Sequence, residues 1–127
     1  MKLTENFSLK EFECKCGCET PKSVLENIRL LVLELQHIRD IFNEPIEINS
    51  AYRCKEHNNL VGGSKNSQHL LGKAVDIVVN NYTPNEVQET IIYLRETGCS
   101  ELNGIGRYST FTHVDIRNNI GDWDFRK

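Results

Sequence analysis

The chain is organised around one stretch, Ser67-Gln68-His69-Leu70-Leu71-Gly72-Lys73-Ala74-Val75-Asp76. It places the imidazole of His69 and the carboxylate of Asp76 seven residues apart. Asp76 lies inside an apolar run that predicts a strand over 74–79. The preceding residues, 62–67, are rich in glycine and serine and predict a flexible or turning loop. A loop is therefore expected to deliver the imidazole, and a strand the carboxylate.

A second histidine, His113, lies in another predicted strand, 111–117. A catalytic zinc ion takes three protein ligands and keeps one position open, and two histidines with one carboxylate form an accepted set. We therefore predict that His69, Asp76 and His113 bind one Zn²⁺. The alternative is a surface histidine near an aspartate at a strand end, because a His-x6-Asp spacing also arises by chance.

The second strand carries two more charged residues on the face of His113. Side chains at alternate positions of a strand share one face, so Asp115 and Arg117 lie beside this histidine. Asp115 is thus a candidate catalytic residue, the general base that takes a proton from the attacking water. Its alternative role is to orient His113 through the ring nitrogen that does not bind the metal.

The composition is that of a soluble globular protein. The 127 residues, 39% hydrophobic and 26% charged, suit a single domain over 1–127 with its own core. A net charge of −3 without a basic face argues against a nucleic-acid-binding protein. No apolar run approaches the roughly 20 residues that span a membrane, and the first residues lack the apolar part of a secretory signal. We therefore expect no nucleic-acid or membrane partner, and a protein that is cytoplasmic until it is released. A monomer is also expected.

Five cysteines are an odd number, and three of them lie in one compact turn, Cys14-Lys15-Cys16-Gly17-Cys18. Without a secretory signal, reduced thiols or metal ligands are expected rather than a disulfide framework. One interpretation is a small structural zinc site formed by thiols of this turn together with Cys54. The other is free thiols in a surface turn. The role of Cys99 is left open.

The clearest helix is predicted over 21–42. Pro21 suits its first turn, and apolar residues recur at spacings of three and four. Four more apolar residues are expected to widen the buried face: Leu30, Val32, Leu33 and Ile41. The helix is therefore predicted to be a central, well-buried element.

The remaining elements are shorter. A short helix from Ser8, a strand over 46–51, a short helix over 55–61 and a helix from Thr83 to about 97 are expected. The last of these begins with an N-cap, a first-turn proline and a capping-box glutamate. Residues 104–106 are interpreted as the approach to a turn. Trp123 and Phe125 are interpreted as packed on the body rather than functional.

Several motifs in this order resemble one family of enzymes. They are Phe7-Ser8-Leu9-Lys10-Glu11-Phe12, Asn49-Ser50-Ala51-Tyr52-Arg53, the pattern from Ser67 to Asp76, Gly104-Ile105-Gly106-Arg107-Tyr108 and His113-Val114-Asp115. Together they resemble the zinc D-alanyl-D-alanine carboxypeptidases and the phage L-alanyl-D-glutamate endolysins. These enzymes share a fold with the hedgehog amino-terminal domain and lysostaphin-type enzymes.

The resemblance implies a site and a substrate. It implies zinc at His69, Asp76 and His113, and peptidoglycan stem peptides as the partner. It also implies that Arg53 lies at the active site, as a catalytic or substrate-binding residue that contacts the substrate or the oxyanion, which suits a guanidinium. Without the resemblance, a surface salt bridge would be the better interpretation of this arginine.

Two further residues of the opening stretch, Ser67 and Gln68, either bind the substrate through hydrogen bonds or only shape the loop.

This chain does not carry the complete pattern of the enzymes that it resembles. Some relatives carry an acidic general base three positions before the second histidine, where this chain has Thr110. Others carry a histidine two positions before it, where this chain has Phe111. Asp115 is then the best remaining candidate base, and Glu101 is a poorer one.

Taken together, the sequence predicts an α+β fold with a small, mainly antiparallel sheet packed on helices, like that of hedgehog domains and DD-peptidases. The predicted function is a zinc metallopeptidase, a hydrolase cutting amide bonds in peptidoglycan stem peptides of the cell wall, of the carboxypeptidase or endolysin type. The alternative is a non-catalytic zinc-containing binding module or a phage structural component that contacts wall peptides. A phage protein of this kind would reach the wall on release or as part of a virion.

Overall fold

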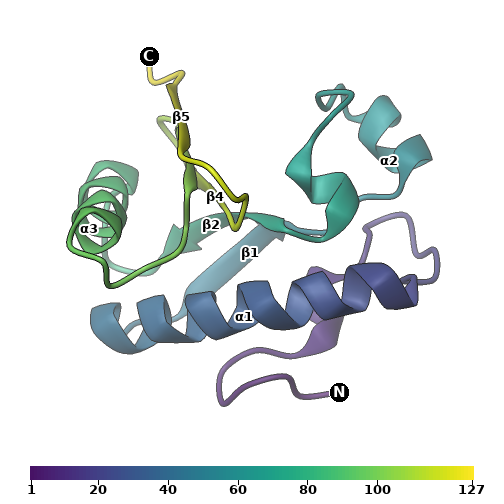
Figure 1. Cartoon of the computed structure of the whole chain (residues 1–127), viewed down its shortest axis with the longest axis horizontal. Coiled ribbons are helices and arrows are strands. Elements are labelled where there is room, and N and C mark those ends of the chain that lie inside the picture. Colours follow the sequence, from purple (N-terminus) through teal and green to yellow (C-terminus); the bar gives the residue numbers. More distant parts are fainter.

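The computed structural model describes all 127 residues and shows an α+β fold (Figure 1). Its elements, in chain order, are η1 (Leu9–Phe12), α1 (Lys22–Phe42), β1 (Ile46–Ser50), α2 (Lys55–Leu60), η2 (Gln68–Leu71), β2 (Ala74–Val79), α3 (Pro84–Glu96), β3 (Gly104–Arg107), β4 (Thr112–Asp115) and β5 (Gly121–Asp124). None of the helices combines the length and the apolar composition needed to cross a membrane.

The five strands form one sheet in the order β1-β2-β4-β3-β5. The pairs β1–β2, β2–β4 and β4–β3 are antiparallel, and only β3–β5 is parallel. The predicted α+β class, with a mainly antiparallel sheet packed on helices, is confirmed.

One apolar core joins the sheet to the helices. Val75 and Ile77 of β2 and Val114 of β4 are fully buried in a cluster with Leu35 of α1 and Ile91 of α3. Because strand side chains alternate between faces, the residues between them point to the opposite face of the sheet. That opposite face carries Asp76 and His113, so the core supports the site from behind.

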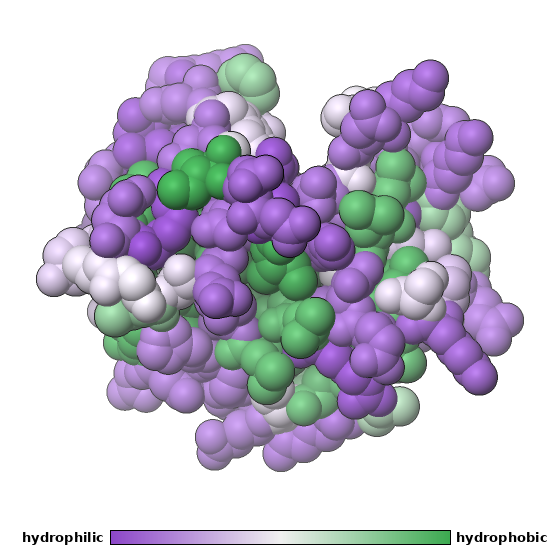
Figure 2. Space-filling model, in the orientation of Figure 1, coloured by the Kyte–Doolittle hydropathy of each residue, from purple (hydrophilic) through white to green (hydrophobic).

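The long helix α1 begins after Pro21, which is its N-cap, and ends at Phe42 with Asn43 in the left-handed region. Of the four residues expected to widen its buried face, Val32 is fully buried. Leu30, Leu33 and Ile41 are instead 57%, 62% and 42% exposed, so this prediction is wrong for three of them. They lie on the outer side of the helix, and apolar side chains gather on the molecular face that α1 crosses (Figures 1 and 2).

The predicted helix starts are present. The backbone N–H of Glu86 donates to the Thr83 hydroxyl and the backbone N–H of Thr83 donates to the Glu86 carboxylate, which completes the capping box of α3. The short helix expected from Ser8 is a 3₁₀ helix, η1, in which Glu11 accepts from the Ser8 backbone N–H.

The end of the chain differs most from the prediction. Residues 104–107 form strand β3 rather than the approach to a turn, and residues 121–124 form strand β5, which was not predicted. Strand β4 covers Thr112–Asp115 within the predicted range 111–117. Strands β3 and β5 were not predicted because they contain glycines, at 104, 106 and 121, and glycine is depleted from strands in general.

Candidate functional site

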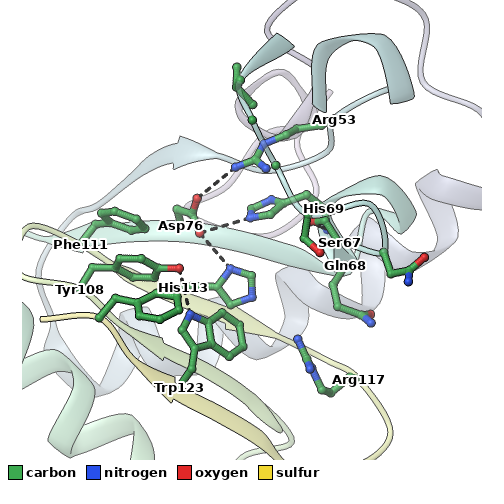
Figure 3. Close-up of a pocket in the computed structure, with 16 residues that line it drawn as sticks. Arg53, Ser67, Gln68, His69, Asp76, Tyr108, Phe111, His113, Arg117 and Trp123 are labelled. Atoms are coloured by element: carbon green, nitrogen blue, oxygen red, sulfur yellow. Dashed lines mark hydrogen bonds and ion pairs between the residues drawn. The ribbon is translucent and has the colours of Figure 1, made fainter. Parts of the chain in front are cut away.

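Sheet register brings the predicted ligands together. Asp76 of β2 pairs directly with His113 of β4, so their side chains emerge side by side on one face. The Nδ1 atom of His113 lies 3.1 Å from one Asp76 carboxylate oxygen, and Nε2 of His69 lies 3.3 Å from the same oxygen. One donor atom from each of the three residues lies within 4.8 Å of the other two. Figure 3 shows both imidazoles pointing at the carboxylate.

His69 is delivered by the 3₁₀ helix η2 rather than by a flexible loop. The Ser67 hydroxyl caps this helix by accepting from the His69 backbone N–H. The Nδ1 atom of His69 lies 2.7 Å from the carbonyl oxygen of Ala51, a geometry in which Nδ1–H donates. The residue is buried, with an exposed fraction of 3%. This hydrogen bond fixes the tautomer and leaves Nε2 free to bind a metal.

His113 is held from behind by Asp115. Its Nε2 atom lies 2.7 Å from a carboxylate oxygen of Asp115, while Nδ1 faces Asp76. Asp115 is fully buried, and Arg117 donates to both of its oxygens, from Nε at 2.8 Å and from Nη2 at 2.7 Å. The carboxylate therefore accepts Nε2–H and leaves Nδ1 of His113 facing Asp76. This is the carboxylate–histidine arrangement that supports metal ligands.

The pKa values of these groups follow from their contacts. Burial would raise the pKa of Asp76, but hydrogen bonds from His113 and His69 outweigh it and lower this pKa below its usual range. Burial likewise opposes ionisation of Asp115, yet His113 and Arg117 lower its pKa to about 2. Burial disfavours the charged form of His113, but Asp115 and Asp76 raise its pKa overall. Both carboxylates are therefore ionised near neutral pH and favour a bound cation.

The donor set fits a zinc ion. Two imidazole nitrogens and one carboxylate oxygen converge from a rigid sheet and a short helix, which matches the set of catalytic zinc sites. Each histidine has its second nitrogen occupied by an oxygen acceptor, Ala51 or Asp115. The three ligand atoms open onto a cleft, so a fourth position remains for a ligand.

The cleft has a volume of about 600 Å³ and lies between the α2–η2 side and the β4–β5 side. The surface is hollowed between these two sides in Figure 2. Ser67 and Gln68, predicted to contact the substrate, both line it together with the three ligand residues. This position is compatible both with substrate binding and with shaping the loop.

Arg53 lies at the edge of the cleft, next to the ligands. Its Nη2 atom is 3.5 Å from Asp76, and the guanidinium also donates to the Ser50 hydroxyl and the Asn58 side-chain oxygen, both at 3.1 Å. Asn58 is buried and donates in turn to the Ser64 carbonyl. The arginine is thus locked in place beside the metal ligands, rather than forming an isolated surface salt bridge.

An aromatic wall, which sequence reasoning missed, forms the other side of the cleft. Its members are Tyr108, Phe111, Trp123 and Phe125. Tyr108 and Phe111 stack with centroids 4.3 Å apart, and the Trp123 indole N–H donates to the Tyr108 hydroxyl at 2.9 Å. Trp123 also lies 4.8 Å from the His113 ring. Trp123 and Phe125 therefore line the cleft, and the predicted packing on the body is wrong for Phe125, which is 64% exposed.

The sheet register, rather than a pattern in the sequence, places Trp123 beside His113. In the register of the sheet, Gly106 pairs with His113 on one side and with Trp123 on the other. A Cβ atom on Gly106 would lie 2.5–2.7 Å from the indole ring. The glycine therefore makes room for the tryptophan beside the histidine.

The two candidate bases occupy different places. Asp115 does not line the cleft, because it lies behind His113 with both oxygens engaged. Its role as general base stays a prediction, and its geometry favours the orienting role. Glu101 lines a different hollow, beside Leu30 and Arg95, and its backbone N–H donates to Glu34. The structure does not bring Glu101 to the metal ligands.

Comparison with known proteins gives one family. Residues 5–115 match the model of a family described as Peptidase M15. This match includes all three candidate metal ligands, Arg53 and Asp115. A search of curated proteins finds no match.

Proposed function

Because the chain belongs to the zinc-dependent peptidase M15 family, we propose that it hydrolyses amide bonds in peptidoglycan stem peptides. The carboxypeptidases and endolysins that its motifs resemble act on this substrate. The observation that carries the proposal is the convergence of His69, Asp76 and His113, each held by further hydrogen bonds, on one cleft. The three helices and mainly antiparallel sheet agree with the fold of that family.

The residues around the ligands have separable tasks. A zinc ion, when bound, polarises the scissile carbonyl and activates water for attack. Arg53 would bind a substrate carboxylate or the developing oxyanion, because its guanidinium is already oriented by Ser50 and Asn58. Asp115 would keep His113 in the tautomer that presents Nδ1.

The two walls of the cleft suit a peptide. Ser67 and Gln68 offer hydrogen-bonding groups on one side, and the aromatic wall offers apolar surface on the other. Stem peptides combine amide groups with small apolar side chains, so both walls would contact them.

A second candidate function rests on one observation. Asp76 is the single carboxylate among the residues that line the cleft, and it is itself a predicted ligand. Without a free carboxylate near the ligands, proton transfer from the attacking water is poorly supported. A non-catalytic zinc-containing module, or a phage structural component, would bind the same wall peptides through Arg53 and the two walls.

The test is digestion of purified murein and of a peptide ending in D-Ala-D-Ala, with and without a chelator. We expect product release that the chelator abolishes, and in His113→Ala the loss of activity together with the zinc bound at the histidine site. His37→Ala is the matched control, because this exposed histidine lies on α1 away from the cleft. The masses of the products separate the two activities, since a carboxypeptidase releases D-alanine and an endolysin releases larger fragments.

The alternative makes a different prediction. Suppose that the wild type holds zinc at the histidine site, that His113→Ala loses this zinc, and that the wild type binds murein without cleaving any wall peptide. This result would reject the peptidase and support the binding module.

A further inference from the structure

A second group of metal-binding side chains lies outside the cleft. The turn 14–18 contributes Cys14, Cys16 and Cys18, and the residue before α2 contributes Cys54. The Sγ atoms of Cys14 and Cys16 are 3.3 Å apart, those of Cys16 and Cys54 are 3.6 Å apart, and those of Cys14 and Cys54 are 3.8 Å apart. All four sulfur atoms lie within 4.8 Å of one another, and all four cysteines are free.

These distances match a tetrahedral site. Zinc binds cysteine sulfur at about 2.3 Å, so the edges of a regular tetrahedron of four sulfurs measure about 3.8 Å. We propose that Cys14, Cys16, Cys18 and Cys54 bind a structural zinc ion, as a second metal centre of the protein. The fold supplies the fourth sulfur, from Cys54. It therefore favours metal ligands over free thiols as the role of the cysteine turn.

The local backbone is built for this cluster. Gly17 adopts a left-handed φ of 84° and its N–H donates to the Cys14 carbonyl at 3.0 Å, which curls the turn so that its three thiols point one way. A glycine takes this conformation without strain. Backbone N–H groups also donate to the sulfurs: that of Cys54 to Cys14, and that of His57 to Cys54, both at 3.4 Å. Such donors stabilise thiolates, the form that binds metal.

The centre is structural rather than catalytic. Four sulfur ligands complete the tetrahedral coordination and leave no open position. None of the four cysteines lines the cleft. Figure 1 shows the amino-terminal segment looping beneath α2, where the ion would join two parts of the chain 36–40 residues apart.

The position of this centre links it to the cleft. Cys54 directly follows Arg53, whose backbone N–H donates to the His69 carbonyl. Ala51, three residues before Cys54, accepts the hydrogen bond from the His69 ring. A metal ion at Cys54 would therefore anchor the short segment 51–54 that holds both Arg53 and His69 in place.

The test counts zinc in the purified full-length protein. We expect two equivalents per chain in the wild type and in Cys99→Ser, the matched control, because Cys99 is exposed and outside the cluster. His69→Ala/His113→Ala should retain one equivalent. Adding Cys16→Ser, at the exposed member of the cluster, should remove it or weaken its binding at least tenfold. Cobalt substituted into the double histidine variant should give the sulfur-to-metal absorption of a tetrathiolate.

Two results would overturn this proposal. One is a folded double histidine variant that binds neither zinc nor cobalt under reducing conditions. The other is a disulfide within the cluster, found by mass analysis of non-reduced peptides from protein purified without chelator. Both results concern the cysteines alone, so they are distinguishable from a failure of the zinc peptidase, which would appear as absent cleavage with zinc at the histidine site.

Discussion

At the scale of single residues, the position of Asp115 distinguishes between two possible roles, orienting a metal ligand and accepting a proton from water. Its two oxygens accept hydrogen bonds from His113 and Arg117, and no part of the residue is exposed. A general base must reach the attacking water. A supporting carboxylate must instead contact the ligand histidine, as Asp115 does.

We expect Asp115→Asn to weaken zinc binding at the histidine site about 10–100-fold, because it removes the charge that orients His113. Zinc affinity is measured by competition with a chelator of known affinity. The control is Asp124→Asn, at an exposed carboxylate that pairs only with Arg126. Unchanged zinc affinity together with lost murein cleavage would contradict the orienting role and favour Asp115 as the base.

At the scale of elements, the site is built by one row of residues across the sheet. Ser50, Asp76, His113, Gly106 and Trp123 pair in sequence from β1 to β5. The next row places Asp115 opposite Gly104, where a Cβ atom would collide with the carboxylate. The glycines of β3 therefore make room for functional side chains from both neighbouring strands.

Gly106→Ala is expected to destabilise the protein by about 1–3 kcal/mol, because the added methyl group overlaps the Trp123 ring. The free energy of unfolding is measured by urea denaturation. In a Trp123→Ala background the overlap is gone, so the same substitution should cost much less. Equal costs in both backgrounds would show that the tryptophan is not the partner of this glycine.

At the scale of the whole molecule, the two metal centres have different structural settings. The ligands of the histidine site come from β2, β4 and η2, which the sheet and core already hold together. The cysteine centre joins the amino-terminal segment to the start of α2. A backbone hydrogen bond also connects these two regions of the chain, from the Tyr52 N–H to the Phe12 carbonyl oxygen at 3.2 Å. Metal loss should therefore loosen the chain only around the cysteines.

Chelation of His69→Ala/His113→Ala, which keeps only the cysteine centre, is expected to lower its Tm and to raise hydrogen exchange in residues 13–21 and 54–60. An ion present at 100 times its Kd stabilises the folded state by about 2.7 kcal/mol. Strands β2 and β4 should stay protected. The same variant carrying Cys16→Ser should not respond to the chelator. A response spread evenly over the chain would contradict a local structural centre.

Local patterns in the sequence predicted the ligands and most elements. His69 and Asp76 stand out through their spacing and the strand that follows, and a period of two places Asp115 and Arg117 beside His113. The capping box of α3 and the start of α1 were also predicted, because caps and periodicity depend only on residues a few positions apart.

Long-range pairing accounts for what the sequence left open. The pairing of β3 with β4 and β5 forms a strand from residues that were interpreted as the approach to a turn, and it brings Trp123 to His113. The fold also placed Asp115 behind its histidine and carried Cys54 to the cysteine turn. Each of these contacts joins residues through the register of a sheet or the path of a loop. Burial and strand pairing across the whole chain set that register, so no short window of sequence contains it.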